Sequence, residues 1–203
     1  MILAFDTSSA ACTVALFDDV GTVVTCRDEI IGRGHAEQLV PMIRDVMDGR
    51  RADRILVGVG PGSFTGIRVA IAAAHGLAIG WKAEIKGVSS LGLIAAGAAG
   101  EGEIAVAVTG GHGELFVQQF DAATFQPTSE LLNLPPAEAA RATTAELVVG
   151  SGAPQLIEAR RWGEAREAWP SASNALKMPE EMRALSAKPV YARAPDARVP
   201  EAA

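Results

Sequence analysis

The fold is decided by the stretch Gly58-Val59-Gly60-Pro61-Gly62-Ser63-Phe64-Thr65-Gly66-Ile67-Arg68. A short apolar run at residues 54–59 leads into it, and an alanine-rich apolar segment at residues 67–79 follows. The run has the length of a buried strand, and the segment has the length and composition of a helix. A strand, a glycine-rich loop and a helix in this order predict an α/β protein.

The glycine-rich loop has two interpretations. It lacks the Gly-Lys-Ser/Thr ending of a Walker A loop, and its glycine spacing misses the dinucleotide pattern by one residue. Ser63 and Thr65 nevertheless stand where a helix begins, and the free N–H groups there favour an anion or a side-chain cap. A phosphate loop, with Gly60 and Gly62 allowing close approach, and a tight turn with an N-cap are equally compatible with the spacing.

A carboxylate ends the first apolar run of the chain, residues 2–6. Asp6 with the small hydroxyl residues after it can hold Mg²⁺ and phosphate oxygens, or it can simply terminate a strand and its turn. No His-x-x-x-His pair and no nucleophile–base order stands out, so no catalytic residue and no metal site is assigned. The expected degenerate phosphate or nucleotide loop consists of Asp6, Thr7, Ser8, Gly60, Gly62, Ser63 and Thr65.

The first half of the chain combines a strand-rich start with alternating helices and strands. Three apolar runs, the last two separated by Asp18-Asp19-Val20-Gly21, predict antiparallel neighbours. The alternation that follows predicts a mixed sheet with helices on its faces. The expected elements are strands at 2–6, 13–17, 22–27, 54–59 and 84–88 and helices at 35–47, 67–79 and 90–99.

The second half repeats this order in a shorter form. It opens with hairpin material and later places a short strand before a glycine-rich loop and a helix. The repetition predicts a duplicated βββαβα unit with a reduced second copy. The expected domains are 1–100 and 101–187, with an irregular tail at 188–203. The expected elements are strands at 104–109, 115–121 and 147–149 and helices at 136–142, 155–162 and 173–185.

Two helices of the first half differ in how their apolar residues are distributed. Helix 35–47 carries one apolar stripe, which recurs at i, i+4, i+7 and i+8 from Leu39. Helix 67–79 has small residues on many faces, so another helix can approach it closely. Gly76 in its interior costs on the order of 1 kcal/mol against alanine, and it needs a packing reason or marks a break. The small residues can serve packing within the chain or contact with a partner protein. Their spread over many faces of the helix favours contact with a partner.

Composition and charge limit the function classes. The 203 residues carry a formal charge of −6, so RNA contact by this chain alone should be weak or confined to a local arginine cluster. The start MILAFDTSS is unlike a signal peptide, and the uncharged stretches fall short of the roughly 20 apolar residues of a membrane helix. We expect a cytoplasmic protein with no membrane span. Cys12 and Cys26 are expected to be reduced thiols, with a bridge between them left open.

Several strings of the sequence resemble one protein family. They are ILAFDTSSAACTVAL near the start, the helix HAEQLVPMI, and above all GVGPGSFTGIRVAIAAAHGLA followed by GVSSL. Together they resemble the TsaB family, also called YeaZ, and the tail PVYARAPDA is similar to its C-terminal Pro-Tyr-Arg segment. The resemblance covers about residues 1–95 strongly and the rest loosely. It implies the actin, sugar-kinase and Hsp70 type of RNase H-like fold, which agrees with the duplicated halves.

The resemblance also implies a function. Members are scaffold subunits, without catalytic residues, of the bacterial complex that forms N6-threonylcarbamoyladenosine in tRNA. The implied partners are the homologous catalytic subunit TsaD, the ATPase TsaE, tRNA only indirectly, and a second copy of the chain when TsaD is absent. No cofactor of its own is implied, and the subunit contact leaves room for ATP or ADP. Pairing uses helices 35–47 and 65–79, and the expected interface residues are His35, Leu39, Ile43, Ile67, Arg68, Ile71, Ala74, His75 and Ala78.

This chain departs from the family pattern in one turn. Where members carry an Asp-Ala-Arg-like string, it has Thr109-Gly110-Gly111-His112-Gly113-Glu114-Leu115-Phe116, so no role is assigned there. The short second half also argues against a complete nucleotide cleft. Two other hypotheses stay open. One is a stand-alone ATP-dependent phosphotransferase or glycoprotease-like hydrolase of the same fold, and the other is a homodimeric binding module with an unrelated partner.

Overall fold

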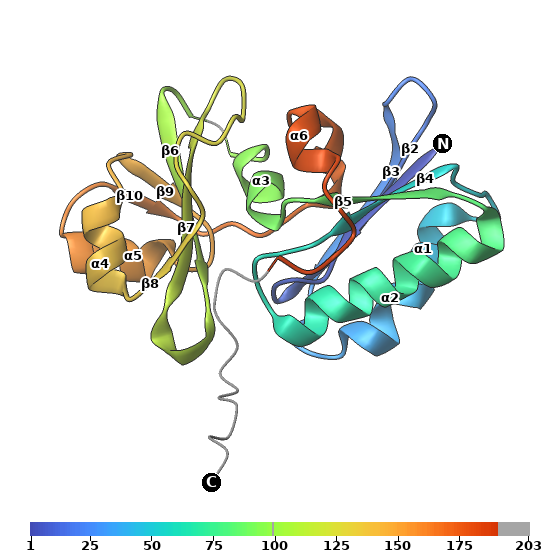
Figure 1. Ribbon diagram of the computed structural model, residues 1–203, viewed down its shortest axis with the longest axis horizontal. Helices are drawn as coiled ribbons and strands as arrows, with labels where there is room; N and C mark the ends of the chain where they lie inside the picture. Colours follow the sequence, from blue (N-terminus) through green and yellow to red (C-terminus); the bar gives the residue numbers. More distant parts are fainter. Residues whose placement is uncertain (99, 191–203) are drawn as a thin grey trace, which may run out of the picture.

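Two five-stranded sheets with the same strand arrangement form the protein (Figure 1). The structure is a computed structural model that describes residues 1–98 and 100–190. Most of the expected irregular tail, 188–203, therefore lies outside the described residues. The predicted α/β class and the duplication are both confirmed.

The first sheet has the order β3-β2-β1-β4-β5. Its first three strands are antiparallel neighbours, as predicted, and the last two continue parallel to β1. Parallel neighbours need a crossover, and α1 and α2 provide it on one face of the sheet (Figure 1). The elements are β1 (Ile2–Asp6), β2 (Ala11–Phe17), β3 (Val23–Ile30), α1 (His35–Met47), β4 (Arg54–Gly58), α2 (Phe64–Trp81) and β5 (Glu84–Val88).

The second sheet repeats this order position by position, as β10-β9-β6-β7-β8. β6 takes the place of β1, with an antiparallel hairpin on one side and a parallel strand on the other. The second copy is thus complete in strands and reduced in length. Its elements are β6 (Glu103–Thr109), β7 (Leu115–Asp121), β8 (Leu132–Leu134), α4 (Pro136–Ala142), β9 (Leu147–Val149), α5 (Ala153–Arg160) and β10 (Glu164–Arg166).

Two strands that the sequence pattern does not predict, β8 and β10, have three residues each. β10 is exposed along its whole length, so no alternation of apolar and polar residues marks it. The helix predicted at residues 173–185 is wrong. The segment instead forms a 3₁₀ turn, η2 (Ala172–Lys177), and a one-turn helix, α6 (Glu180–Arg183), because Pro179 cannot continue a helix and keeps the residue before it extended.

Two predicted helices have different ends in the structure. The helix placed at 67–79 is α2, which extends by three residues at its start and two at its end, because Ser63 caps it and Lys82 ends it in the left-handed conformation. By length and composition α2 could cross a membrane, but four of its residues are buried within the protein. The helix placed at 90–99 is α3 (Ser90–Ala95), and residue 99 lies outside the described residues.

The C-terminal segment returns to the first sheet. The Ala172 N–H donates to the Thr13 hydroxyl at 2.7 Å, and the Ser171 hydroxyl donates to the Asp28 carboxylate at 2.7 Å. Farther along, Leu185 pairs with Gly87 of β5 through backbone hydrogen bonds. The boundary at residues 100 and 101 stays a prediction. Residues 171–185 nevertheless pack on the first half.

A shared hydrophobic core joins the two halves. The face of the first sheet opposite α1 and α2 contributes Ala15 and Phe17, and the second sheet contributes Val106 and Phe120 to the same cluster. α3, η2 and α6 fill the space between the sheets (Figure 1). A second cluster lies under α1 and α2, and a smaller one lies under α4 and α5. The halves are therefore packed against each other over a continuous apolar surface.

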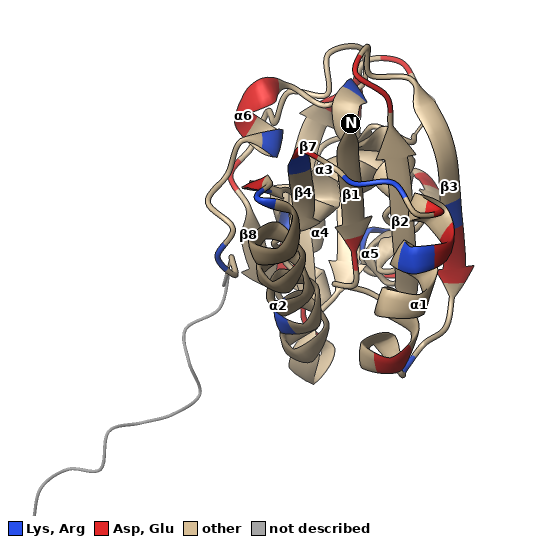
Figure 2. Ribbon diagram, turned by 90° about the vertical axis from the view of Figure 1, so that its right-hand side faces the viewer, with Lys and Arg blue, Asp and Glu red and all other residues tan. Residues whose placement is uncertain are grey.

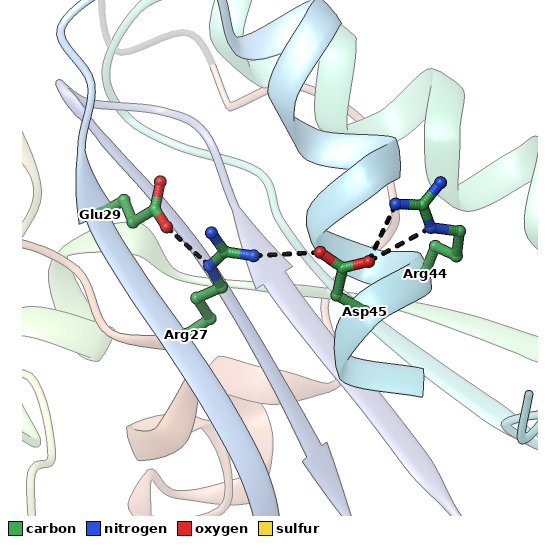
Figure 3. Close-up of polar contacts among 4 residues, drawn as sticks. All are labelled: Arg27, Glu29, Arg44 and Asp45. Atoms are coloured by element: carbon green, nitrogen blue, oxygen red, sulfur yellow. Dashed lines mark hydrogen bonds and ion pairs between the residues drawn. The ribbon is translucent and has the colours of Figure 1, made fainter. Parts of the chain in front are cut away.

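Exposed side chains link α1 to the edge strand β3 (Figure 3). Arg27 Nη1 lies 3.1 Å from Asp45 Oδ2, and Arg27 Nε lies 2.6 Å from Glu29 Oε1. Asp45 also contacts Arg44 at 3.0 Å. On this strand Cys26 is exposed, while Cys12 of β2 is buried, and both are free thiols. In the pairing of β2 with β3, Cys26 stands opposite Ala15 and Cys12 stands opposite Glu29. The disulfide that the sequence left open between Cys12 and Cys26 is therefore wrong.

Candidate functional site

A cleft of about 1250 Å³ opens between the halves. It lies where the matching strands β1 and β6 end, because Ser8 and Thr109 both line it. The starts of α1 and α2 form its wall in the first half, and the turn η1 (Gly111–Gly113) with Ser151 forms its wall in the second. Duplicated sheets thus place their matching loops on either side of one cavity.

Asp6 is fully buried at the end of β1 and does not line the cleft. Its Oδ1 accepts hydrogen bonds from the Ser8 N–H and hydroxyl, both at 2.7 Å, and its Oδ2 accepts one from the Ser90 hydroxyl. Burial raises the pKa of the Asp6 carboxyl, and the hydroxyl donors oppose that shift only in part. Glycine at position 58 leaves room for this carboxylate, since a Cβ there would collide with it.

The glycine-rich loop packs directly on the backbone that follows β1. A Cβ at Gly62 would collide with the Ser8 carbonyl, and one at Gly66 would collide with the Thr7 carbonyl. Thr7 Oγ1 donates to the Gly66 carbonyl at 2.7 Å, and the Ser63 N–H donates to the Ser8 carbonyl at 2.6 Å. These glycines therefore serve a close approach between two loops of the same chain.

The predicted phosphate-loop residues are brought together, but in two layers. Asp6 and Thr7 are buried beneath the surface, and Gly60 lies outside the cleft lining. Ser8, Gly62, Ser63 and Thr65 line the cleft. Ser63 acts as the N-cap of α2, accepting from the Gly66 N–H at 3.2 Å. Phosphate or nucleotide binding by this loop stays a prediction, and within residues 1–98 and 100–190 no group of three metal-ligating side chains occurs.

The second half has its own loop at the cleft. The Ser151 hydroxyl accepts from the Thr109 N–H at 3.2 Å, and a Cβ at Gly150 would collide with the Ala107 carbonyl. This close contact matches the packing of the first glycine loop on the end of β1. The altered turn from Thr109 onward lies at the cleft, with His112 in the left-handed conformation.

Four of the nine predicted interface residues face inward, so that part of the prediction is wrong. The apolar stripe of α1 packs on the sheet, as amphipathic helices do, and α2 buries a second set below it. The inward-facing residues are Leu39, Ile43, Ile67 and Ala74. The other five are partly or fully exposed: His35, Arg68, Ile71, His75 and Ala78.

The outer face of α2 carries exposed residues that the sequence analysis did not name. Ile79 is 83% exposed and Phe64 is 55% exposed, and on α1 Val40 is 57% exposed. Arg68 is the one charged residue of α2, and Figure 2 shows this helix almost free of charge beside the charged α1. Only the full extent of α2 reveals this apolar row, because Phe64 lies outside the predicted helix.

The family model described as TsaD, tRNA N6-adenosine threonylcarbamoyltransferase, matches residues 27–165. The tRNA threonylcarbamoyladenosine biosynthesis protein TsaB of Escherichia coli is 41% identical over 102 residues, which cover 48% of this chain and 43% of that protein. The TsaB protein of Haemophilus influenzae is 37% identical over 95 residues, covering 44% and 39%. The chain thus spans about two fifths of the length of the curated relatives it matches.

A solved structure, YeaZ from Pseudomonas aeruginosa, aligns with a TM-score of 0.80 at 29% identity, covering 94% of this chain and 98% of that one. The duplicated sheets and the cleft between them define a protein of the actin and sugar-kinase type of fold. From the match over residues 27–165 and these relatives, the chain belongs to the TsaD-type family and, within it, to the TsaB (YeaZ) group.

Proposed function

We propose that this chain is a non-catalytic subunit of the complex that forms N6-threonylcarbamoyladenosine in tRNA. It binds and activates a TsaD-type transferase subunit through the outer face of α1 and α2. The relatives named TsaB support the assignment to this tRNA modification, and the match to the TsaD family model supports a TsaD-type subunit as the partner. Two chains of one fold carry the same pair of helices, so they can pair them across an approximate twofold axis.

One observation carries the choice of surface. Gly76 lies inside an unbroken 18-residue helix, and a Cβ built there would have no neighbour within 4 Å. Packing within the chain therefore gives no reason for a glycine that costs on the order of 1 kcal/mol. Gly80, one turn farther on, is equally open. Both positions suit a partner helix whose backbone approaches closely.

The alternative of a stand-alone phosphotransferase or hydrolase is not favoured. The fold and the pairing of Asp6 with the loop Gly60–Gly66 motivate it, but both oxygens of the Asp6 carboxylate accept hydrogen bonds inside the fold. The remaining parts of the proposal follow the family. A TsaE-type ATPase joins the complex, ATP or ADP binds at the subunit contact, a homodimer forms through the same helices in isolation, and the setting is cytoplasmic.

The test places two substitutions at Gly76. Gly76→Ala should raise the free energy of unfolding by about 1 kcal/mol, because alanine favours an exposed helix interior. Gly76→Trp should leave the isolated chain folded, since the position is open, yet abolish co-purification with TsaD and stop tRNA modification by the reconstituted system.

Ala137→Trp is the matched control, because Ala137 is an exposed small residue on a helix of the other half. It should bind TsaD as the parent chain does. Full TsaD binding and activation by Gly76→Trp would contradict the proposed surface. Modification that does not depend on the chain at all would contradict the proposed function.

A further inference from the structure

The cleft between the halves differs in charge from the molecule around it. The chain carries a formal charge of −6. Among the described residues that line the cleft, however, the cationic or titratable groups are Arg33, Arg68, His35 and His112, against the one carboxylate of Glu37. The two arginines outnumber the carboxylate, and an excess of one sign of charge in a concave site attracts ligands of the opposite sign. The cleft therefore suits an anion.

Aromatic rings line the same cleft. Phe64 of α2 is 55% exposed and Trp169, after β10, is partly exposed, whereas Phe116 of β7 is only 8% exposed. The Arg68 guanidinium lies over the Phe64 ring, 3.6 Å from its centroid, so a cation already stacks on a ring at the start of α2. Flat rings beside arginines are the lining on which nucleic-acid bases stack in single-strand binding proteins.

We propose that the cleft binds a short single-stranded segment of RNA, with a phosphodiester near Arg33 and Arg68 and a base against the aromatic rings. The proposal rests on the proposed function and deepens it, because it gives this chain a direct contact with the tRNA of the complex. An acidic chain with one cationic, aromatic cleft binds RNA weakly and at one place.

The lining favours a phosphodiester over a free nucleoside triphosphate. A triphosphate arrives with Mg²⁺, which prefers oxygen ligands and commonly a carboxylate. Asp6 at the end of β1 is buried and hydrogen-bonded to Ser8 and Ser90, which leaves Glu37 as the one carboxylate among the described residues that line the cleft. A phosphodiester carries a single charge and needs no metal, so two arginines can neutralise it.

The experiment uses the isolated full chain and a fluorescently labelled oligouridine of about ten nucleotides, with fluorescence anisotropy read at several salt concentrations. Each phosphate contact on a single strand contributes about 0.7 to the slope of log affinity against log salt. Arg33→Ala should weaken binding several-fold and lower that slope by about 0.7. Trp169→Leu should weaken binding roughly tenfold and leave the slope unchanged, because stacking releases no counterion.

Arg51→Ala is the matched control. It removes the same charge from an exposed position before β4, at the end of the sheet opposite the cleft, and it should leave the affinity unchanged. Because Arg33 is exposed, Arg33→Ala should fold, and it tests the proposal even if Trp169→Leu fails to fold.

Three outcomes would overturn the proposal. They are equal weakening by Arg51→Ala, no RNA binding by the folded parent chain at low salt, and displacement of RNA by Mg–ATP that binds more tightly than the RNA. The RNA assay contains no TsaD, so its failure is separate from a failure of partner binding at Gly76. An unmodified tRNA transcript in place of oligouridine extends the same measurement to the expected substrate.

Discussion

The Asp6 carboxylate accepts hydrogen bonds from Ser8 in the turn after β1 and from Ser90 of α3, and Ser90 in turn contacts the glycine loop. Ser90 Oγ donates to Asp6 and accepts from the Gly60 N–H at 3.1 Å. The acid thus fixes the position of the loop that precedes α2. Asp6 therefore helps to shape the edge of the cleft, from which α2 begins.

The raised pKa of Asp6 makes a testable contribution to stability. Burial raises the pKa in the folded state above the unfolded value, so the folded state holds its proton at higher pH than the unfolded state does. The contribution of protonated Asp6 to stability is fully present below the pKa of its carboxyl in the unfolded chain. It is lost as pH rises through the pKa of that carboxyl in the folded protein. Relative to Asp6→Asn, the parent chain should therefore lose stability as pH rises above 3.8, the ordinary pKa of an aspartate carboxyl. Urea unfolding of both proteins across this range measures it, and parallel curves would contradict it.

At the scale of single elements, α1 is held to β3 by the exposed cluster of Arg27, Glu29, Asp45 and Arg44 (Figure 3). Water and salt screen exposed pairs, which contribute little. Arg27→Ala should therefore lower the free energy of unfolding by less than about 1 kcal/mol, and 0.5 M salt should remove most of that difference. Denaturant unfolding with and without salt is the measurement. A loss of several kcal/mol that persists in salt would show that Arg27 acts by packing.

Elements with a strong periodic signal could be predicted from the sequence, and those fixed by distant contacts could not. α1 begins and ends as predicted, because its apolar stripe and the Gly34 that precedes it are local signals. Residues 173–185 carry helix-forming residues, but Pro179 and the contacts of Ala172 with β2 decide their structure. For the site, the glycine loop was visible in the sequence. Arg33, Phe116 and Trp169 were not, because only the fold brings them to one cleft.

At the scale of the whole molecule, the shared core predicts one unfolding transition. Phe120 of β7 is fully buried in the cluster that also contains Phe17 of β2. Phe120→Ala should lower the free energy of unfolding by about 3–5 kcal/mol and destabilise both halves together. Tryptophan fluorescence from Trp81 in a Trp162→Phe/Trp169→Phe variant and from Trp162 in a Trp81→Phe/Trp169→Phe variant should give the same midpoint. Two separate midpoints would show halves that unfold independently.

The return of the C-terminal segment to the first sheet also has a consequence for synthesis. β2 and β5 leave the ribosome early, but the residues that cover them, Ala172 and Leu185, are added last. At about 5–20 residues per second, the stretch between β5 and η2 takes several seconds to translate. During that interval the apolar face of the nascent first half has no cover of its own. The nascent chain should therefore be a chaperone client until its last residues emerge.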